Sequence, residues 1–150
     1  MRAVIQRVKK ASVTVEEIVI GSIETGYLIF LGIDPEDALT DQEWLIKKIT
    51  TLKLFPDTEG RMSKSLLDVE GSTLIISQFT LHASTKKGTR PSFHRSAPPE
   101  VAEKLYNSFC EALKTTMPHK VQTGKFGAHM DICLLNDGPI TLILDSKNPE

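Results

Sequence analysis

The chain lacks several features that would place it in a common class. Its 150 residues contain no run of 18 apolar residues, so no segment is predicted to span a membrane. The start leads directly into strand-like sequence and not into a signal-peptide pattern, and we expect a cytoplasmic protein. Only two cysteines are present, Cys110 and Cys133, and without a CxxC pair they are expected to be free thiols. A formal net charge of −1 argues against bulk electrostatic coating of nucleic acid.

The usual catalytic and metal-binding motifs are also missing. The four histidines are scattered without an HExxH pair, so no metal ion or other cofactor is predicted. No GxSxG elbow, P-loop or GxGxxG is present. Between Gly71 and Pro99 there is no Asp or Glu, so that region offers neither a catalytic triad nor a pair of catalytic acids. Chemistry there must work without a conventional general base.

Composition and periodicity predict one α+β domain spanning residues 1–150. A chain of this length with 40% hydrophobic residues can bury one core. Helical spacing predicts helices over about 40–52 and 98–113. Since no regular βαβ alternation is evident, we predict a curved or barrel-like antiparallel β-sheet flanked by two main helices. Period-2 patterns predict the main strands over residues 2–8, 12–16, 18–23, 27–31, 73–76, 120–123, 130–135 and 140–144.

The most informative stretch is residues 73–83, where an apolar run passes directly into polar residues. The run predicts a buried strand up to Ile76, and Ser77, Gln78 and Thr80 follow it. Hydroxyl, carboxamide and backbone N–H groups at such a rim are suited to stabilising a substrate oxygen that gains negative charge. The alternative is that Ser77 and Thr80 only satisfy backbone groups at the strand end.

A cationic loop follows this stretch immediately. Lys86, Lys87, Arg90 and Arg95 lie in the region that has no acidic residue. An anionic nucleic-acid backbone bound there would lie beside the polar rim. The alternative is a solvated basic loop.

Arg7 occupies an unusual position. By period 2 it shares a face with Ala3 and Ile5. An unpartnered buried charge is costly, so Arg7 should be paired or hold a carbonyl group, unless it reaches water at the strand's end.

Residues 136–139, Asn-Asp-Gly-Pro, separate two strand patterns. In isolation they predict a hairpin turn. A Gly-Pro bond can also be cis and present rigid carbonyl groups.

Two of these stretches together resemble the signature motifs of a known family. Ser77-Gln78-Phe79-Thr80-Leu81 and Asn136-Asp137-Gly138-Pro139-Ile140-Thr141 resemble those of the D-aminoacyl-tRNA deacylases. The similarity extends in order over nearly the whole chain, through residues 5–8, 11–13, 90–93 and 122–126 and Met130.

The resemblance implies a homodimer that hydrolyses the ester bond of D-aminoacyl-tRNA, with glycyl-tRNA as a further candidate substrate. Gly138 and Pro139 of one subunit, joined by a cis peptide bond, would enter the other subunit's pocket and exclude L-amino acids. Arg7 would hold this motif in position. No cofactor is implied, and neither DNA nor a membrane is an expected partner.

The resemblance also implies roles around the polar rim. Phe79 and Thr80 would be catalytic, their backbone N–H groups stabilising the oxyanion, while the ribose hydroxyl next to the ester assists hydrolysis. An older alternative, Thr80 as nucleophile, would need an activating base. Substrate binding is assigned to Ser77, Gln78 and Met130, with Gly138 and Pro139, and tRNA contact to Lys86, Lys87, Arg90 and Arg95.

Two other function classes remain open from the residues alone. The acid-free basic region also suits a dimeric RNA-binding module without activity. A small-molecule hydrolase that uses the Thr80 hydroxyl is the second alternative.

Overall fold

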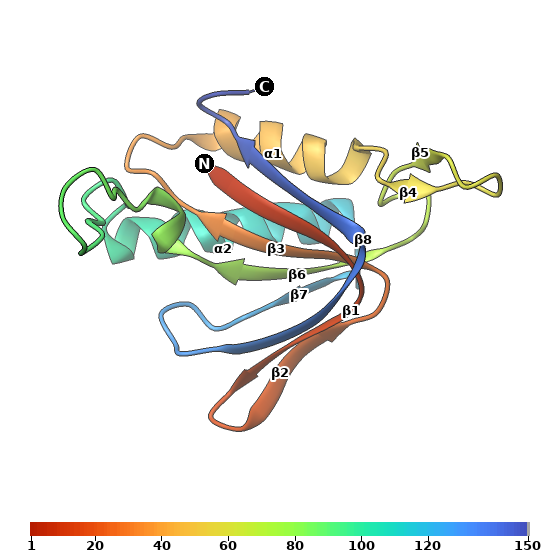
Figure 1. Cartoon of the computed structure of the whole chain (residues 1–150), viewed down its shortest axis with the longest axis horizontal. Coiled ribbons are helices and arrows are strands. Elements are labelled where there is room, and N and C mark those ends of the chain that lie inside the picture. The colour runs from red at the N-terminus through yellow and green to blue at the C-terminus, as the bar shows by residue number, and fades with distance from the viewer. Residues whose placement is uncertain (150) are drawn as a thin grey trace.

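The computed structural model describes residues 1–149 and shows a strongly curved β-sheet with helices packed on one face (Figure 1). No helix within these residues is long and apolar enough to cross a bilayer. The elements of the main sheet are β1 (Arg2–Val15), β2 (Ile18–Ile23), β3 (Gly26–Gly32), β6 (Ser72–Ser77), β7 (Val121–Thr123) and β8 (Asp131–Asp145). The remaining elements are α1 (Leu39–Thr51), the hairpin β4 (Phe55–Pro56) and β5 (Met62–Lys64), the short 3₁₀-helix η1 (Phe79–His82), and α2 (Pro99–Thr116).

The predicted α+β class, the curved sheet and the two main helices are confirmed within the described residues. The sheet is mixed, however, and not antiparallel throughout. β1 pairs antiparallel with β2, β3 and β8, whereas β3, β6 and β7 run parallel. The reason is connectivity: α1 lies between β3 and β6 and α2 between β6 and β7, and such helical crossovers return the chain in the same direction.

The predicted separation of a strand over residues 2–8 from one over residues 12–16, with Lys9 and Lys10 between them, is wrong. β1 continues from Arg2 to Val15 and changes partner on the way. Its first half pairs with β3 and its second half with β2, while β8 runs along its other edge. The exposed lysines lie where the register with β8 shifts, so they mark an irregularity inside a strand and not its end.

The curved sheet is buried on both faces by two apolar clusters. Alternate residues of the central strands, such as Ile29 and Ile75, face the helices and pack with Leu45 and Phe109. The residues between them face the inside of the curl, where the second cluster is formed by Val8, Ala11, Val13, Ile23, Leu28, Leu74 and Ile76. Because β6 is buried on both faces, its end is a rigid platform for the polar residues that follow.

Candidate functional site

The site begins where β6 ends. The chain leaves the strand at Ser77 and turns at once into η1. The Gln78 N–H donates to the Leu31 carbonyl of β3 at 2.8 Å, which fixes this turn to the sheet. Phe79 is 56% exposed, and Thr80 is exposed beside it. Polar groups at this strand end therefore remain accessible to a ligand.

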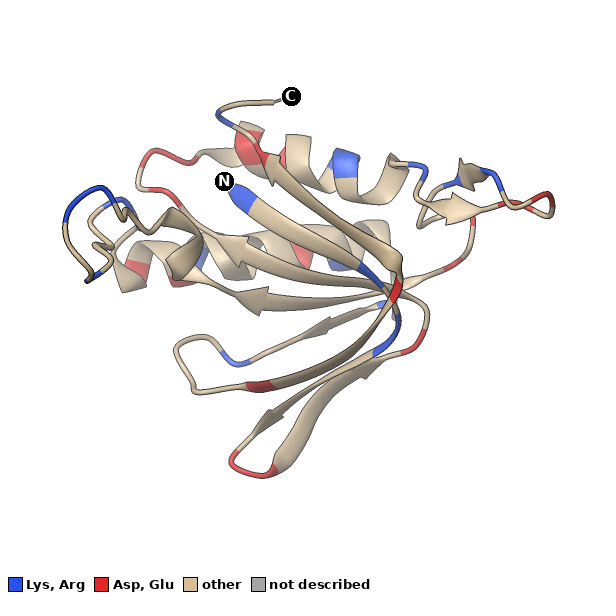
Figure 2. Cartoon of the chain, in the orientation of Figure 1, with Lys and Arg blue, Asp and Glu red and all other residues tan. Residues whose placement is uncertain are grey.

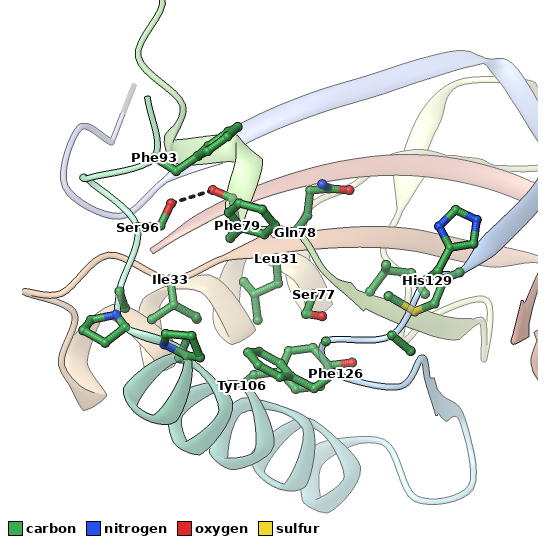
Figure 3. Close-up of a pocket in the computed structure, with 18 of the residues that line it drawn as sticks. Leu31, Ile33, Ser77, Gln78, Phe79, Phe93, Ser96, Tyr106, Phe126 and His129 are labelled. Carbon is green, nitrogen blue, oxygen red and sulfur yellow. Dashed lines mark hydrogen bonds between the residues drawn. The ribbon is translucent and has the colours of Figure 1, made fainter. Parts of the chain in front are cut away.

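A pocket of about 640 Å³ opens beside this turn (Figure 3). Its floor is apolar and lies between the central strands and the start of α2. Ser77, Gln78 and Phe79 form one wall, and residues 126–130 form the opposite one. The floor is lined by Leu31, Ile33, Ile76, Ala97, Ala102 and Tyr106. This combination of an apolar floor with a few polar groups at the rim is typical of a small-ligand site.

Tyr106 is a buried polar group in the floor. Its hydroxyl donates to the Ile75 carbonyl at 2.8 Å, and burial raises its pKa above the ordinary value. Cys110, one turn further along α2, is also buried, and burial raises the pKa of its thiol to about 11. Both groups therefore stay protonated at neutral pH, and neither is an anionic nucleophile there.

The pocket provides little conventional acid–base chemistry. Among the described residues that line it, none is Asp or Glu. His129 lines the rim, with its Nε2 3.6 Å from Asp131 Oδ1, but its side chain is exposed to solvent. Within residues 1–149 no group of His, Cys, Asp and Glu side chains is arranged to hold a metal ion.

The structure brings together only part of the predicted site. Ser77, Gln78, Phe79 and Met130 line the pocket. Thr80 lies next to it without lining it, and its hydroxyl accepts a hydrogen bond from the Gln78 carboxamide. Phe93, Ser96, Tyr106 and His129 also line the pocket and were not predicted, although a tyrosine among the apolar residues of the second helix was a usable signal.

The cationic loop begins and ends at this pocket. In Figure 2 it carries blue segments between η1 and α2. Lys86, Lys87, Arg90 and Arg95 are all exposed. Phe93 leads back to the pocket wall, where its ring makes a T-shaped contact with Phe79 at 5.1 Å between centroids. The predicted adjacency of positive charge and polar rim is therefore present in the structure.

The Gly-Pro segment is not a hairpin turn, which corrects the prediction from the isolated motif. β8 pairs with β1 on both sides of it: Asn136 faces Val8, and Thr141 faces Gln6. Arg7 therefore lies opposite the four residues 137–140, which bulge out of the strand. The Asn136 side chain closes the bulge, since its Oδ1 accepts from Ile140 N–H at 2.9 Å and its Nδ2 donates to the Ile140 carbonyl at 3.2 Å.

Glycine is required at Gly138. The residue has φ of +142°, and a Cβ there would lie 2.9 Å from the Ile140 nitrogen. The Gly138–Pro139 peptide bond is cis, and both residues are exposed. Neither residue lines the pocket of its own chain.

Arg7 is 8% exposed and holds carbonyl groups, as its position on the apolar face predicted. Its Nε donates to the Asp137 carbonyl at 3.0 Å and lies 3.1 Å from Asp137 Oδ2. Its Nη1 donates to the Leu54 carbonyl, and its guanidinium carbon lies 5.9 Å from the centre of the Phe55 ring. The alternative that Arg7 extends into water is therefore wrong.

Comparisons with known proteins agree with this architecture. A family model described as D-Tyr-tRNA(Tyr) deacylase matches residues 4–145. The chain is 53% identical over 147 residues to a D-aminoacyl-tRNA deacylase of Thermosipho africanus, covering 98% of each chain. It is 51% identical over 150 residues to one of Bacteroides fragilis, covering both in full.

Two solved structures are also similar. One, titled c-Myc DNA Unwinding Element Binding Protein, has a TM-score of 0.92 at 44% identity and covers 97% of this chain and 98% of its own. The other is described as a probable eukaryotic D-amino acid tRNA deacylase. It has a TM-score of 0.81 at 18% identity, covers 95% and 97% of the two chains, and supports the fold.

Proposed function

The chain belongs to the D-Tyr-tRNA(Tyr) deacylase family, and we propose that its pocket hydrolyses the ester bond between a D-amino acid and the terminal adenosine of tRNA. Free amino acid and free tRNA are the products, and one deacylase domain spans the chain. The observation that carries this proposal is the continuity of the pocket with the exposed cationic loop. A pocket of about 640 Å³ is large enough for a nucleoside with an attached amino acid, and the loop is suited to the phosphates that follow.

In the proposed reaction the protein supplies positioning and electrostatic stabilisation. The backbone N–H groups of Phe79 and Thr80 stabilise the oxyanion that forms when water attacks the ester carbonyl. The ribose hydroxyl next to the ester assists the attacking water, which fits a pocket whose described lining contains no carboxylate. Ser77, Gln78 and Met130 orient the adenosine and the aminoacyl group.

Rejection of L-amino acids is assigned to Gly138 and Pro139 of a second subunit. Both residues are exposed and lie outside the pocket of their own chain, so they are free to enter a partner's pocket. Arg7 and Asn136 hold the bulge that carries them. Their carbonyl groups would leave no room for the side chain of an L-amino acid, while a D-amino acid or glycine fits.

An exposed apolar surface on β8 supports the homodimer that this arrangement needs. Leu134 is 38% exposed, Leu135 49% and Ile143 71%, all on the strand that carries the bulge. Large apolar side chains exposed on both sides of the bulge give β8 apolar area that a partner chain could cover. We propose that the dimer acts in the cytoplasm.

The decisive test compares two mirror-image substrates. The purified full-length protein is incubated with D-tyrosyl-tRNA, L-tyrosyl-tRNA and glycyl-tRNA, and loss of the ester is followed against buffer alone. We expect rapid loss of the D-ester and little loss of the L-ester, unchanged by a metal chelator. Equal rates for the two tyrosyl esters would refute the proposal. Tight binding of uncharged tRNA without turnover of any ester would favour the inactive RNA-binding module instead.

A further inference from the structure

We propose that Ser96 is a positioning residue that fixes the peptide group between Phe79 and Thr80. It thereby sets the direction of the Thr80 N–H toward the reacting ester. This inference deepens the function proposed above and rests on it for its catalytic consequence. The effect of Ser96 on the Thr80 amide can be tested in the ligand-free protein, whatever the substrate is.

The hydrogen bond that carries the inference joins a side chain to the backbone of the site. Ser96 Oγ donates to the Phe79 carbonyl oxygen at 2.9 Å (Figure 3). The Phe79 carbonyl and the Thr80 N–H belong to the same planar peptide group, so fixing one fixes the other. A donor on the carbonyl also polarises the amide, which makes its N–H a stronger hydrogen-bond donor.

This peptide group has few other constraints. Phe79 and Thr80 are exposed, and neither N–H donates a hydrogen bond within residues 1–149. Bonds outside the peptide hold the turn at both sides: Gln78 N–H donates to Leu31, and Arg2 Nη1 donates to the Leu81 carbonyl at 2.7 Å. Within η1, the Phe79 carbonyl is in position for the i→i+3 bonding of a 3₁₀-helix. Outside η1, the donor to this carbonyl among the described residues is the Ser96 hydroxyl.

Ser96 itself is held in place by its surroundings. Its N–H donates to the Phe93 carbonyl at 2.9 Å, and the next residue, Ala97, donates to the Ile33 carbonyl at 3.0 Å. The Phe93 and Phe79 rings form a T-shaped pair with an interplanar angle of 68°. The hydroxyl is therefore presented to the carbonyl by a segment fixed on both sides. The segment that closes the cationic loop also orients the proposed oxyanion donor.

The inference predicts an effect on the chemical step and not on binding. Ser96→Ala should lower kcat about three- to tenfold, the expected range for one lost neutral hydrogen bond, with KM unchanged within twofold. Ser96→Thr should restore most of the rate because it keeps the hydroxyl. Ser84→Ala is the matched control: Ser84 lies at the other end of the same loop, and its hydroxyl makes no hydrogen bond within residues 1–149.

Amide NMR of the ligand-free protein provides the second measurement. The Thr80 amide resonance should shift in Ser96→Ala and keep its place in Ser84→Ala, while resonances remote from the substituted residue and from η1 stay as in the wild type. If the wild type fails to hydrolyse D-aminoacyl-tRNA, the proposed function fails, yet the Thr80 shift still tests the positioning.

Three results would overturn the inference. One is a Ser96→Ala enzyme with the kcat of Ser84→Ala. Another is a raised KM at constant kcat, which would make Ser96 a substrate contact. The third is a spectrum altered throughout the molecule, which would make its role structural.

Discussion

Arg7 of β1 lies opposite Asp137 of β8 at the point where the two strands stop pairing, and its guanidinium joins the carbonyl groups of Asp137 and Leu54. A cation buried on the apolar face thus connects the bulge to the loop after α1. The bulge is held from two sides, by Arg7 from β1 and by Asn136 from β8 itself.

Arg7→Lys should weaken this connection although it keeps the charge. A lysine presents one ammonium and cannot reproduce the fork of donors that reaches two carbonyl groups. We expect the free energy of unfolding to fall by about 1–3 kcal/mol, and the ratio of D-ester to L-ester hydrolysis to fall at least tenfold. Urea unfolding and the paired tyrosyl-tRNA assays measure the two effects. Arg61→Lys on the exposed hairpin is the control, and equal behaviour of the two variants would contradict the assigned role.

The two bonds that the Asn136 side chain makes to Ile140 can be separated by substitution. In Asn136→Asp the carboxylate still accepts from Ile140 N–H but no longer donates to the Ile140 carbonyl, whereas Asn136→Ala loses both bonds. Hydrogen exchange at the Ile140 amide should therefore accelerate strongly in the alanine variant and much less in the aspartate variant. Discrimination against the L-ester should fall in both, since both loosen the bulge. Unchanged exchange in the alanine variant would show that Asn136 does not close the bulge.

The outcome for this segment shows what the sequence could and could not predict. Asn-Asp-Gly-Pro is a good turn sequence, and nothing local distinguishes a hairpin from a bulge. The difference lies in β1, which pairs with both halves of β8 and so prevents them from pairing with each other. The parallel strands were missed for a similar reason, since the order β3-β6-β7 depends on where the helical crossovers pack.

Local patterns were informative where residues are adjacent in sequence. The apolar run of β6 predicted the strand, and of the polar residues at its end Ser77 and Gln78 line the pocket whereas Thr80 does not. Ser96 was missed because its partner Phe79 lies 17 positions earlier and its hydroxyl bonds a carbonyl group, which leaves no trace in residue type. Tyr106 bonds Ile75 across 31 positions, and helical periodicity showed only that its face is buried.

Thr80→Val and His129→Gln together test the assistance from the ribose hydroxyl. Thr80 does not line the pocket. Among the described residues that line it, His129 supplies the imidazole. If the substrate assists its own hydrolysis, each variant should keep kcat within about fivefold of the wild type. Replacing the ribose hydroxyl next to the ester by hydrogen should instead lower kcat at least a hundredfold. Loss of activity in Thr80→Val with an intact fold would favour the nucleophile, and loss in His129→Gln a side-chain base.

Asp41 in α1 should make the free energy of unfolding depend on pH in the acidic range. Burial opposes its charge, but hydrogen bonds from Ser146, Ala38 and Lys147 lower the pKa of its carboxyl to about 2. A folded-state pKa below the unfolded value stabilises the protein above about pH 4, and this contribution is lost as the pH falls toward 2. Asp41→Asn should lower the free energy of unfolding by about 2 kcal/mol at pH 6. Its free energy of unfolding should also fall less steeply than that of the wild type between pH 4 and 2. Urea unfolding at a series of pH values across this range measures both effects. If the plots of unfolding free energy against pH were parallel for wild type and variant, the low pKa would not belong to Asp41.

The cationic loop should affect binding of tRNA more than catalysis. Replacing Lys86 and Lys87 together by alanine removes two exposed charges that face no acidic residue in the loop. We expect KM for D-tyrosyl-tRNA to rise about tenfold with kcat unchanged within twofold, and the slope of log KM against log salt to fall by about 2. Lys114→Ala is the control, because this lysine is paired with Glu111 in the last turn of α2, while the loop adjoins the first turn.

A salt slope equal to that of the wild type would mean that the two lysines do not contact phosphate. A fall in kcat alone would instead mean that the loop acts on the site through the segment containing Phe93 and Ser96.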